Sequence, residues 1–201
     1  KALASGAEIR ELHERELLVQ MDGTATTALN ALEDLNKPVI CAINGYALGC
    51  GFDLALACDI RISTRRSKFG QPEVSLGLIP GAGGTQRLVR MVGLGRAKEL
   101  IFSGTILTAE EAMAIGLVNH VTEDTRQAVM NASEAMARKI MEKGPVAVAL
   151  AKICINMGSN TDINTGLMLE RMAQTIALST EDRREGTAAF LEKRPAQFQG
   201  R

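Results

Sequence analysis

The fold is decided by a stretch in the first third of the chain, which reads Lys37-Pro38-Val39-Ile40-Cys41-Ala42-Ile43-Asn44-Gly45-Tyr46-Ala47-Leu48-Gly49-Cys50-Gly51-Phe52-Asp53-Leu54-Ala55-Leu56-Ala57-Cys58-Asp59-Ile60-Arg61-Ile62-Ser63. The pattern predicts a short buried strand that ends at Gly45, a glycine-punctuated turn over residues 46–51, an apolar helix over 52–58 and a second strand over 59–63. A turn that opens onto a helix leaves backbone N–H groups that can face a ligand.

Composition and charge exclude several classes of protein. Hydrophobic residues make up 46% and charged residues 23% of the 201 residues, as in ordinary globular proteins, and the formal net charge is zero. A balanced charge indicates no nucleic-acid partner, and the apolar runs are too short for membrane insertion. The four cysteines lack C-x-x-C spacing. We therefore expect reduced, buried thiols and a reducing compartment.

A second glycine cluster follows, and it reads Pro80-Gly81-Ala82-Gly83-Gly84-Thr85-Gln86-Arg87. It lacks the Lys-Ser/Thr pair of a phosphate-binding Walker loop, and Gln86 stands where a dinucleotide-binding fingerprint has its third glycine. Neither kind of nucleotide site is indicated. Further along, residues 93–103 form a helical pattern, residues 108–112 are typical of a capped helix start, and residues 116–121 predict a short strand.

Beyond about residue 122 the chain becomes helical. Three long patterns predict helices over 128–140, 145–157 and 165–177, and Thr180-Glu181-Asp182 begins a further one. We expect an α/β core over residues 1–121 and a helical region over 122–201. The methionines of this region are interpreted as core or subunit packing rather than as a ligand surface.

Two backbone positions could polarise a carbonyl group. Ala7 and Cys50 each follow a glycine in a tight turn, and two converging N–H donors stabilise the oxyanion that forms on a carbonyl. Each turn alone could simply be a turn. The Cys50 thiol offers another reading, because a thiol at a helix N-terminus can act as a nucleophile.

Asp53 and Glu73 could handle water as a pair. Addition of water to a double bond needs one group that takes a proton from water and another that delivers a proton to carbon. A carboxyl group in an apolar cleft can have its pKa raised enough to do either. The alternative is structural: Asp53 would complement its helix dipole, and Glu73 would form a surface ion pair.

Several blocks together resemble the enoyl-CoA hydratase/isomerase (crotonase) family, and the resemblance covers nearly the whole chain. The blocks are Ser5-Gly6-Ala7-Glu8-Ile9, residues 42–55 with 57–60, Phe69-Gly70-Gln71-Pro72-Glu73, residues 77–88, Asp182-Arg183-Arg184-Glu185-Gly186 and Phe190-Leu191-Glu192-Lys193-Arg194. The family's N-terminal portion, the first turns of its spiral, is expected to be missing before Lys1.

The resemblance implies a fold and an activity. The fold is a crotonase-like ββα spiral, followed by a helical oligomerisation region that assembles homotrimers or homohexamers. The activity is that of an enoyl-CoA hydratase, which adds water to a trans-2-enoyl-CoA without a metal or a cofactor other than the coenzyme A of its substrate. Such enzymes occur in the bacterial cytoplasm or the mitochondrial matrix.

The resemblance also implies roles for particular residues. Asp53 and Glu73 fall on the two catalytic glutamates, and the N–H groups of Ala7 and Cys50 fall on the oxyanion hole. The positions that match the family's substrate-binding residues are Ala4, Ser5, Gly6, Ile9, Gly49, Pro72 and Gly81.

Two residues depart from the family's pattern. Cys50 replaces a glycine, which is tolerable if only its N–H is used and its φ stays allowed. Asp53 replaces a glutamate and is shorter by one methylene, roughly 1 Å, which matters for proton-transfer geometry. A crotonase-fold enoyl-CoA or dienoyl-CoA isomerase and a non-catalytic acyl-CoA-binding homologue therefore stay as alternatives.

Overall fold

The computed structural model describes residues 2–6, 8–10 and 23–201. The chain divides into two compact units, the first made of Lys1–Glu33 and Val39–Ser133 and the second of Asp34–Pro38 and Glu134–Arg201. The division falls inside helix α7 (Arg126–Met141), whereas the boundary expected from the sequence lies at strand β7 (His120–Thr122). The oligomerising role expected of the region after this strand stays a prediction.

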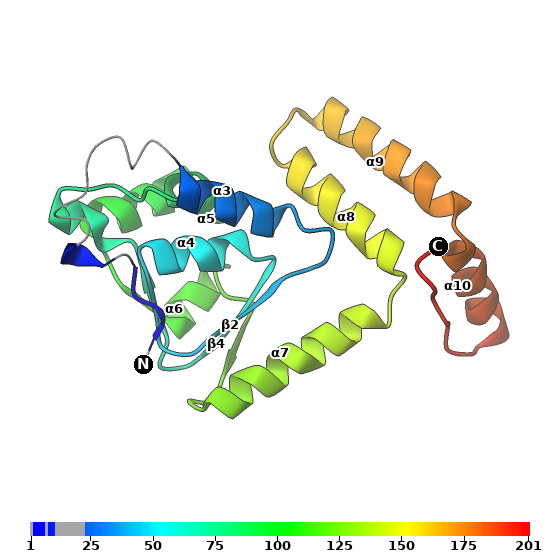
Figure 1. Cartoon of the computed structure of the whole chain (residues 1–201), viewed down its shortest axis with the longest axis horizontal. Helices are drawn as coiled ribbons and strands as arrows, with labels where there is room; N and C mark the ends of the chain where they lie inside the picture. Colours follow the sequence, from blue (N-terminus) through cyan, green and yellow to red (C-terminus); the bar gives the residue numbers. More distant parts are fainter. Residues whose placement is uncertain (1, 7, 11–22) are drawn as a thin grey trace. The chain divides into compact units, whose positions relative to one another are not determined.

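The first unit contains two sheets (Figure 1). One has the strand order β1 (Ala2–Ala4), β3 (Tyr46–Leu48), β5 (Lys68–Gly70), β6 (Leu107–Thr108), and the other β2 (Ile40–Ile43), β4 (Ile60–Thr64), β7. All pairs are parallel except β5 with β6. Because β2 and β3, and then β4 and β5, enter different sheets before a helix follows, the chain advances as a spiral. The expected ββα spiral is confirmed.

The helices of this unit are α3 (Thr24–Glu33), α4 (Cys50–Ala57), the 3₁₀ helix η1 (Pro72–Leu76), α5 (Gly84–Ser103) and α6 (Ala109–Ala114). Of these, α4, η1 and α6 begin within two residues of the end of a strand, whereas α5 follows η1 and the second glycine cluster. The capped start predicted at Thr108 is confirmed, because Thr108 and Glu111 form a reciprocal capping box. The pattern over 93–103 is the second half of α5, which has a kink at Gly93, where φ is 79°.

The turn predicted over residues 46–51 is partly wrong. Tyr46–Leu48 is a strand that pairs with β1 on one side and with β5 on the other. Its flanking glycines give it the appearance of a turn, but both of its neighbours come from distant parts of the chain. Pairing of that kind leaves no local pattern in the sequence.

The core of the first unit lies between the sheets and α4. Phe52 of α4 and Phe69 of β5 are fully buried, and their ring centroids are 6.0 Å apart. Pairing of β3 with β5 brings the start of α4 to the end of β5, where the N–H of Gly49 donates to the carbonyl oxygen of Gly70 at 3.0 Å. This contact places the glycine turn beside the segment that carries Glu73.

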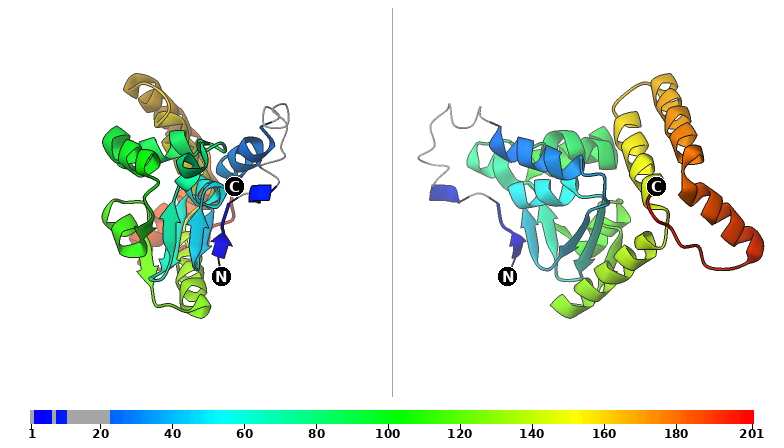
Figure 2. Two further views of the ribbon diagram at one scale, coloured as in Figure 1. Left: turned by 90° about the vertical axis from the view of Figure 1, so that its left-hand side faces the viewer. Right: turned by 45° about the vertical axis from the view of Figure 1, so that its right-hand side comes forward.

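The second unit is helical and includes the part of α7 from Glu134 onward. The observed helices α7, α8 (Pro145–Gly158), α9 (Ile163–Ser179) and α10 (Glu181–Glu192) agree with the predicted ones to within two residues, except that the last was predicted by its start alone. Helices α8 and α9 pack together as an antiparallel pair (Figure 2), and Gly158 and Gly166 permit their close approach. No helix within the described residues is both long enough and apolar enough to cross a membrane.

Candidate active site

The start of α4 depends on the conformation of Gly49. This residue has φ 54° and ψ −128°, which side chains rarely adopt. A Cβ at Gly49 would lie 3.1 Å from Oε1 of Glu73, so the glycine also makes room for that carboxyl group. Cys50 follows as the first helical residue, and its backbone N–H has no hydrogen-bond acceptor among the described residues.

The turn at Gly6 lies against this helix start. Gly6 has φ 97°, and a Cβ built on it would lie 3.3 Å from the carbonyl oxygen of Leu48 and 3.9 Å from the backbone nitrogen of Cys50. Of the two predicted oxyanion donors, Cys50 is therefore next to the expected substrate turn. Ala7, the other donor, lies outside the described residues. The oxyanion role of the pair stays a prediction.

Asp53 is on the buried side of α4, with only 1% of its surface exposed. The side-chain amide of Gln71 donates to Oδ1, and the backbone N–H of Ala82 donates to Oδ2 at 3.2 Å. The second glycine cluster thus supplies a donor to the carboxyl group. Its Gly84 allows this packing, because a Cβ there would lie 1.9 Å from Nε2 of Gln71 and 2.1 Å from Oδ1 of Asp53.

Glu73 is the more accessible of the two acids. It lies in the first turn of η1 and is partly buried, and its Oε2 has no hydrogen-bond partner among the described residues. A buried polar atom without a partner is uncommon in native structures and is often found where a ligand or water binds. The carboxyl group of Glu73 is therefore available to a bound molecule.

The environment raises the pKa of both acids. Burial raises the pKa of Asp53 to about 6, and the negative charge of Glu73 acts in the same direction. The Ala82 N–H, the positive charge of Arg87 and the Gln71 amide oppose this rise. Burial likewise raises the pKa of Glu73, opposed only by its own backbone N–H. Two electrostatically coupled carboxyl groups with raised pKa values can donate and accept protons near neutral pH.

The Cys50 thiol does not have the electrostatics of a nucleophile. Burial, and then the charges of Asp53 and Glu73, raise its pKa, so the protonated thiol is favoured at neutral pH. The φ of Cys50 is not in the left-handed region, as the replacement of a glycine here requires.

Some of the remaining predicted substrate-binding residues lie close to the two acids and the glycine turn, and others do not. The Ala4 carbonyl lies against Gly51, where a Cβ would be 2.2 Å from its oxygen. Pro72 is the first residue of η1, directly before Glu73, and the Gly81 carbonyl accepts a hydrogen bond from Thr26 at 3.3 Å. Ser5 and Ile9 are exposed. No contact of the Ile9 side chain with the acids is found among the described residues.

Three functional contacts escaped prediction from the sequence: the Gln71 amide, the Ala82 N–H and the Arg87 guanidinium. Gln71 is 2% exposed in the structure, and its only signal in the sequence is a polar amide directly after the apolar Phe69-Gly70, two residues before Glu73. The Ala82 N–H had no such signal, because its direction depends on how the glycine loop folds over α4.

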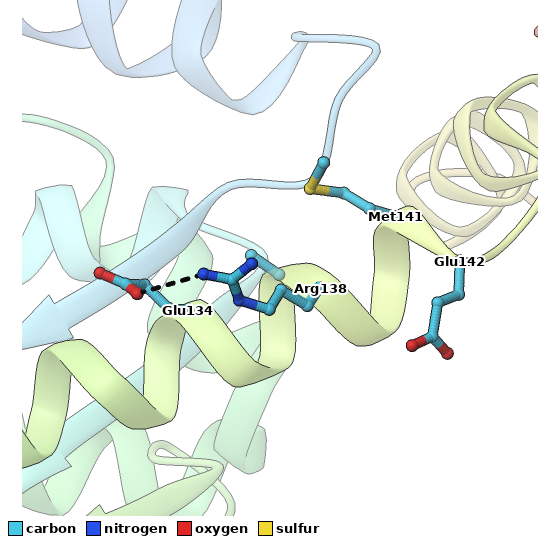
Figure 3. A pocket seen from close by; sticks show the side chains of 5 residues that line it. Glu134, Arg138, Met141 and Glu142 are labelled. Carbon is cyan, nitrogen blue, oxygen red and sulfur yellow. Dashed lines mark ion pairs between the residues drawn. The ribbon is translucent and has the colours of Figure 1, made fainter.

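A separate hollow on α7 carries none of the predicted residues. It is lined by Glu134, Ala137, Arg138, Met141 and Glu142, and the Arg138 Nη2 lies 3.8 Å from the Glu134 Oε2 (Figure 3). All five residues belong to one helix or its end, and the paired side chains are exposed, as is usual for a solvated helix face. Among the described residues, no cluster of three or more metal-binding side chains is present.

Known proteins resemble this chain in sequence and in fold. The chain is 46% identical over 196 residues to the short-chain-enoyl-CoA hydratase of Clostridium acetobutylicum, with 96% of the chain and 74% of that protein covered. It is 41% identical over 200 residues to the crotonyl-CoA hydratase of Syntrophomonas wolfei, with 98% of the chain and 76% of that protein covered.

Solved structures of enoyl-CoA hydratases have the same fold as this chain. The crystal structure of enoyl-CoA hydratase from Bacillus anthracis superimposes with a TM-score of 0.93 at 42% identity and covers 98% of this chain and 76% of that one. The sequence model of the enoyl-CoA hydratase/isomerase family matches residues 1–201. The chain belongs to the enoyl-CoA hydratase/isomerase family.

Proposed function

We propose that the protein is an enoyl-CoA hydratase that adds water to trans-2-enoyl-CoA thioesters and gives 3-hydroxyacyl-CoA. The observation that carries this proposal is the pairing of Asp53 with Glu73 beside the unbonded N–H of Cys50. Membership of the family and relatives named as hydratases support it.

In the proposed reaction, the N–H groups of Cys50 and Ala7 donate to the thioester oxygen. Withdrawal of electrons toward that oxygen makes C3 of the enoyl group electrophilic, and one such donor is worth about 3 kcal/mol in the transition state. Asp53 takes a proton from water as the hydroxyl adds to C3, and Glu73 gives its proton to C2. The proton on Asp53 then passes to Glu73, which restores the ionised Asp53 and the protonated Glu73 of the starting enzyme.

The surroundings of the acids support this division of roles. Asp53 accepts two hydrogen bonds and is near the Arg87 charge, and all three favour the ionised form that a base needs. The Oε2 of Glu73 has no hydrogen-bond partner among the described residues, so this carboxyl group is free to face the substrate, as a proton donor must. An Asp53 pKa of about 6 leaves this carboxyl group mostly ionised at neutral pH.

The direct test is hydration of crotonyl-CoA by purified protein, followed as loss of absorbance of the conjugated thioester and by mass spectrometry of the product. We expect turnover without added metal or cofactor. Glu73→Gln and Asp53→Asn should each lower kcat at least about 100-fold, on the usual scale of acid–base catalysis. Asp53→Glu should keep or raise the rate, because it restores the reach of a longer side chain.

Two outcomes would replace the proposal. Binding of acyl-CoA with no turnover would indicate a non-catalytic binding protein. Full hydration by Asp53→Asn, with Glu73→Gln inactive, would exclude a mechanism that uses both carboxyl groups.

An enoyl-CoA isomerase is the second candidate, and one observation favours it. Asp53 is enclosed by Gln71 and Ala82, whereas Glu73 has an unpartnered oxygen, so one carboxyl group could move a proton between two carbons by itself. Incubation with a 3-enoyl-CoA separates the candidates. An isomerase forms the conjugated 2-enoyl-CoA and adds no water to it.

We also propose that the chain assembles as a homotrimer or a homohexamer. Support comes from α9, where Met168, Met172 and Ile176 recur every fourth residue and are about half exposed. An apolar stripe of this kind on one chain is typical of a helix that packs against another subunit.

A further inference from the structure

Arg87 of α5 is a buried cation that joins α3 to the glycine loop. Its Nε donates to Oε2 of Glu33 at 2.9 Å, and its Nη2 donates to Oδ1 of Asn30 at 2.7 Å. Its Nη1 donates to the carbonyl oxygen of Ala82 at 2.9 Å. Arg87 is 9% exposed and its contact with Ala82 is buried, whereas the Glu33 side chain is 37% exposed, so the ion pair is only partly shielded from water.

The Ala82 residue receives one contact from Arg87 and makes another to Asp53. Its carbonyl accepts from Arg87, and its N–H donates to Oδ2 of Asp53 at 3.2 Å. The two groups lie on the adjacent peptide planes that meet at the Ala82 Cα, so the contact with Arg87 fixes the backbone next to the N–H that donates to Asp53.

The guanidinium has a defined place in the loop. Gly83 has φ 98°, and a Cβ on it would lie 2.3 Å from Nη1 of Arg87. Helix α3 contacts the same loop through a hydrogen bond from Thr26 to the Gly81 carbonyl and through packing of Leu29 against Ala82. Polar and apolar contacts thus hold α3, the loop and Arg87 together.

We propose that Arg87 is a positioning residue for Asp53, and that Glu33, through Arg87, makes the protonation of Asp53 depend on the docking of α3. The proposal rests on the hydratase function proposed above, in which Asp53 acts as the base. Arg87 would act on Asp53 through the Ala82 N–H and through its charge, without touching the substrate.

Removal of the Arg87 charge and removal of the Glu33 charge should shift the pKa of Asp53 in opposite directions. The titratable groups that face Asp53 within the described part of the chain are Glu73 from η1, Arg87 from α5 and Cys50 from α4 itself. The positive charge of Arg87 lowers the pKa of Asp53. Removal of that charge should raise this pKa. Removal of the Glu33 charge leaves Arg87 without its counter-charge, so the pKa of Asp53 should fall.

The test is the pH profile of kcat for hydration of crotonyl-CoA. In Arg87→Met the acid limb should move upward by at least about half a pH unit, and in Glu33→Gln it should move downward. Arg87→Lys keeps the charge but loses the planar fork that holds Ala82, so its acid limb should move upward by less than in Arg87→Met, while kcat falls. KM should change little in all three variants.

Arg90→Met is the matched control, because Arg90 is exposed on the same helix and should leave both limbs unchanged. Unmoved limbs, or limbs that move in the same direction in Arg87→Met and Glu33→Gln, would overturn the proposal. If Arg87→Met does not fold, the pH profiles of Glu33→Gln and Arg87→Lys still test the proposal.

A measurement without substrate separates this proposal from the hydratase function. Titration of the Asp53 side-chain carbon by NMR, in protein labelled at aspartate, should show the same opposite shifts of its pKa. Shifts in a protein that fails to hydrate would uphold the coupling and reject the function. Hydration by a protein whose Asp53 pKa does not shift in these variants would uphold the hydratase function and reject the coupling.

Discussion

Asp53 is a carboxyl group whose burial is only partly compensated. Two donors and a nearby cation favour its ionised form, yet burial and Glu73 still raise its pKa from 3.8 to about 6. The folded protein therefore binds this proton more tightly than the unfolded chain does. At about 1.4 kcal/mol for each pH unit, the difference is up to about 3 kcal/mol.

This residue should make stability depend on pH. Between about pH 4 and pH 6 the unfolded chain releases the proton and the folded protein keeps it, so the free energy of unfolding should fall as pH rises through this window. Urea unfolding at a fixed protein concentration should show this fall, and Asp53→Asn should show a smaller one. Equal pH dependence in both proteins would contradict the burial of an ionisable Asp53.

In the proposed mechanism, Cys50 acts through its backbone N–H rather than through its thiol. Cys50→Gly and Cys50→Ser should keep activity, because neither removes the N–H. Cys50→Pro removes it at the first position of a helix, where proline is best tolerated, and should lower kcat at least about 100-fold. Circular dichroism checks that the variant folds. Equal inactivity of a folded Cys50→Ser would point instead to chemistry at the thiol.

At the scale of elements, the packing of α5 on α4 sets the geometry of Asp53. Gly84→Ala should place a methyl group between Gln71 and Asp53, with a cost of about 1–3 kcal/mol in stability and about tenfold to 100-fold in kcat. Gly95→Ala is the control in the same helix. Apart from the neighbouring backbone of its own helix, no atom of the described residues lies within 4 Å of its added Cβ, so this substitution should stabilise the protein slightly.

The two glycine variants are compared by urea unfolding and by initial rates. We expect Gly84→Ala to lower the free energy of unfolding and Gly95→Ala to raise it slightly, since the first position is crowded and the second is open. A Gly84→Ala protein with unchanged rate and stability would show that the loop can move away from Asp53 at little cost.

Elements differ in how well the sequence predicts them. The start of α6 was predictable because the contacts of Thr108 with Glu111 are local. Strand β3 was mistaken for a turn because its partners, β1 and β5, are distant in sequence. The same limit applies to the site: Asp53 and Glu73 follow from the motif, but the Gln71 amide reaches Asp53 only because β3 pairs with β5.

At the scale of the whole molecule, the helices after β7 illustrate a further limit. Their periodicity predicted where α7, α8 and α9 lie, because each repeats its own amphipathic pattern. The periodicity does not say which apolar faces pack within the chain and which face another subunit. Within the described residues, α8 packs on α9, yet Met168, Met172 and Ile176 of α9 stay exposed.

These exposed side chains lead to a prediction about assembly. Light scattering of the protein at micromolar concentration should give about three or six times the 21.5 kDa of one chain. The double variant Met168→Glu/Met172→Glu should shift the mass toward one chain, because charged residues in an apolar interface are costly to bury. Gln174→Glu lies on another face of α9 and should leave the mass unchanged. A monomer for the unmodified protein would refute the proposed trimer, and dissociation by Gln174→Glu as well would move the interface away from the methionine stripe.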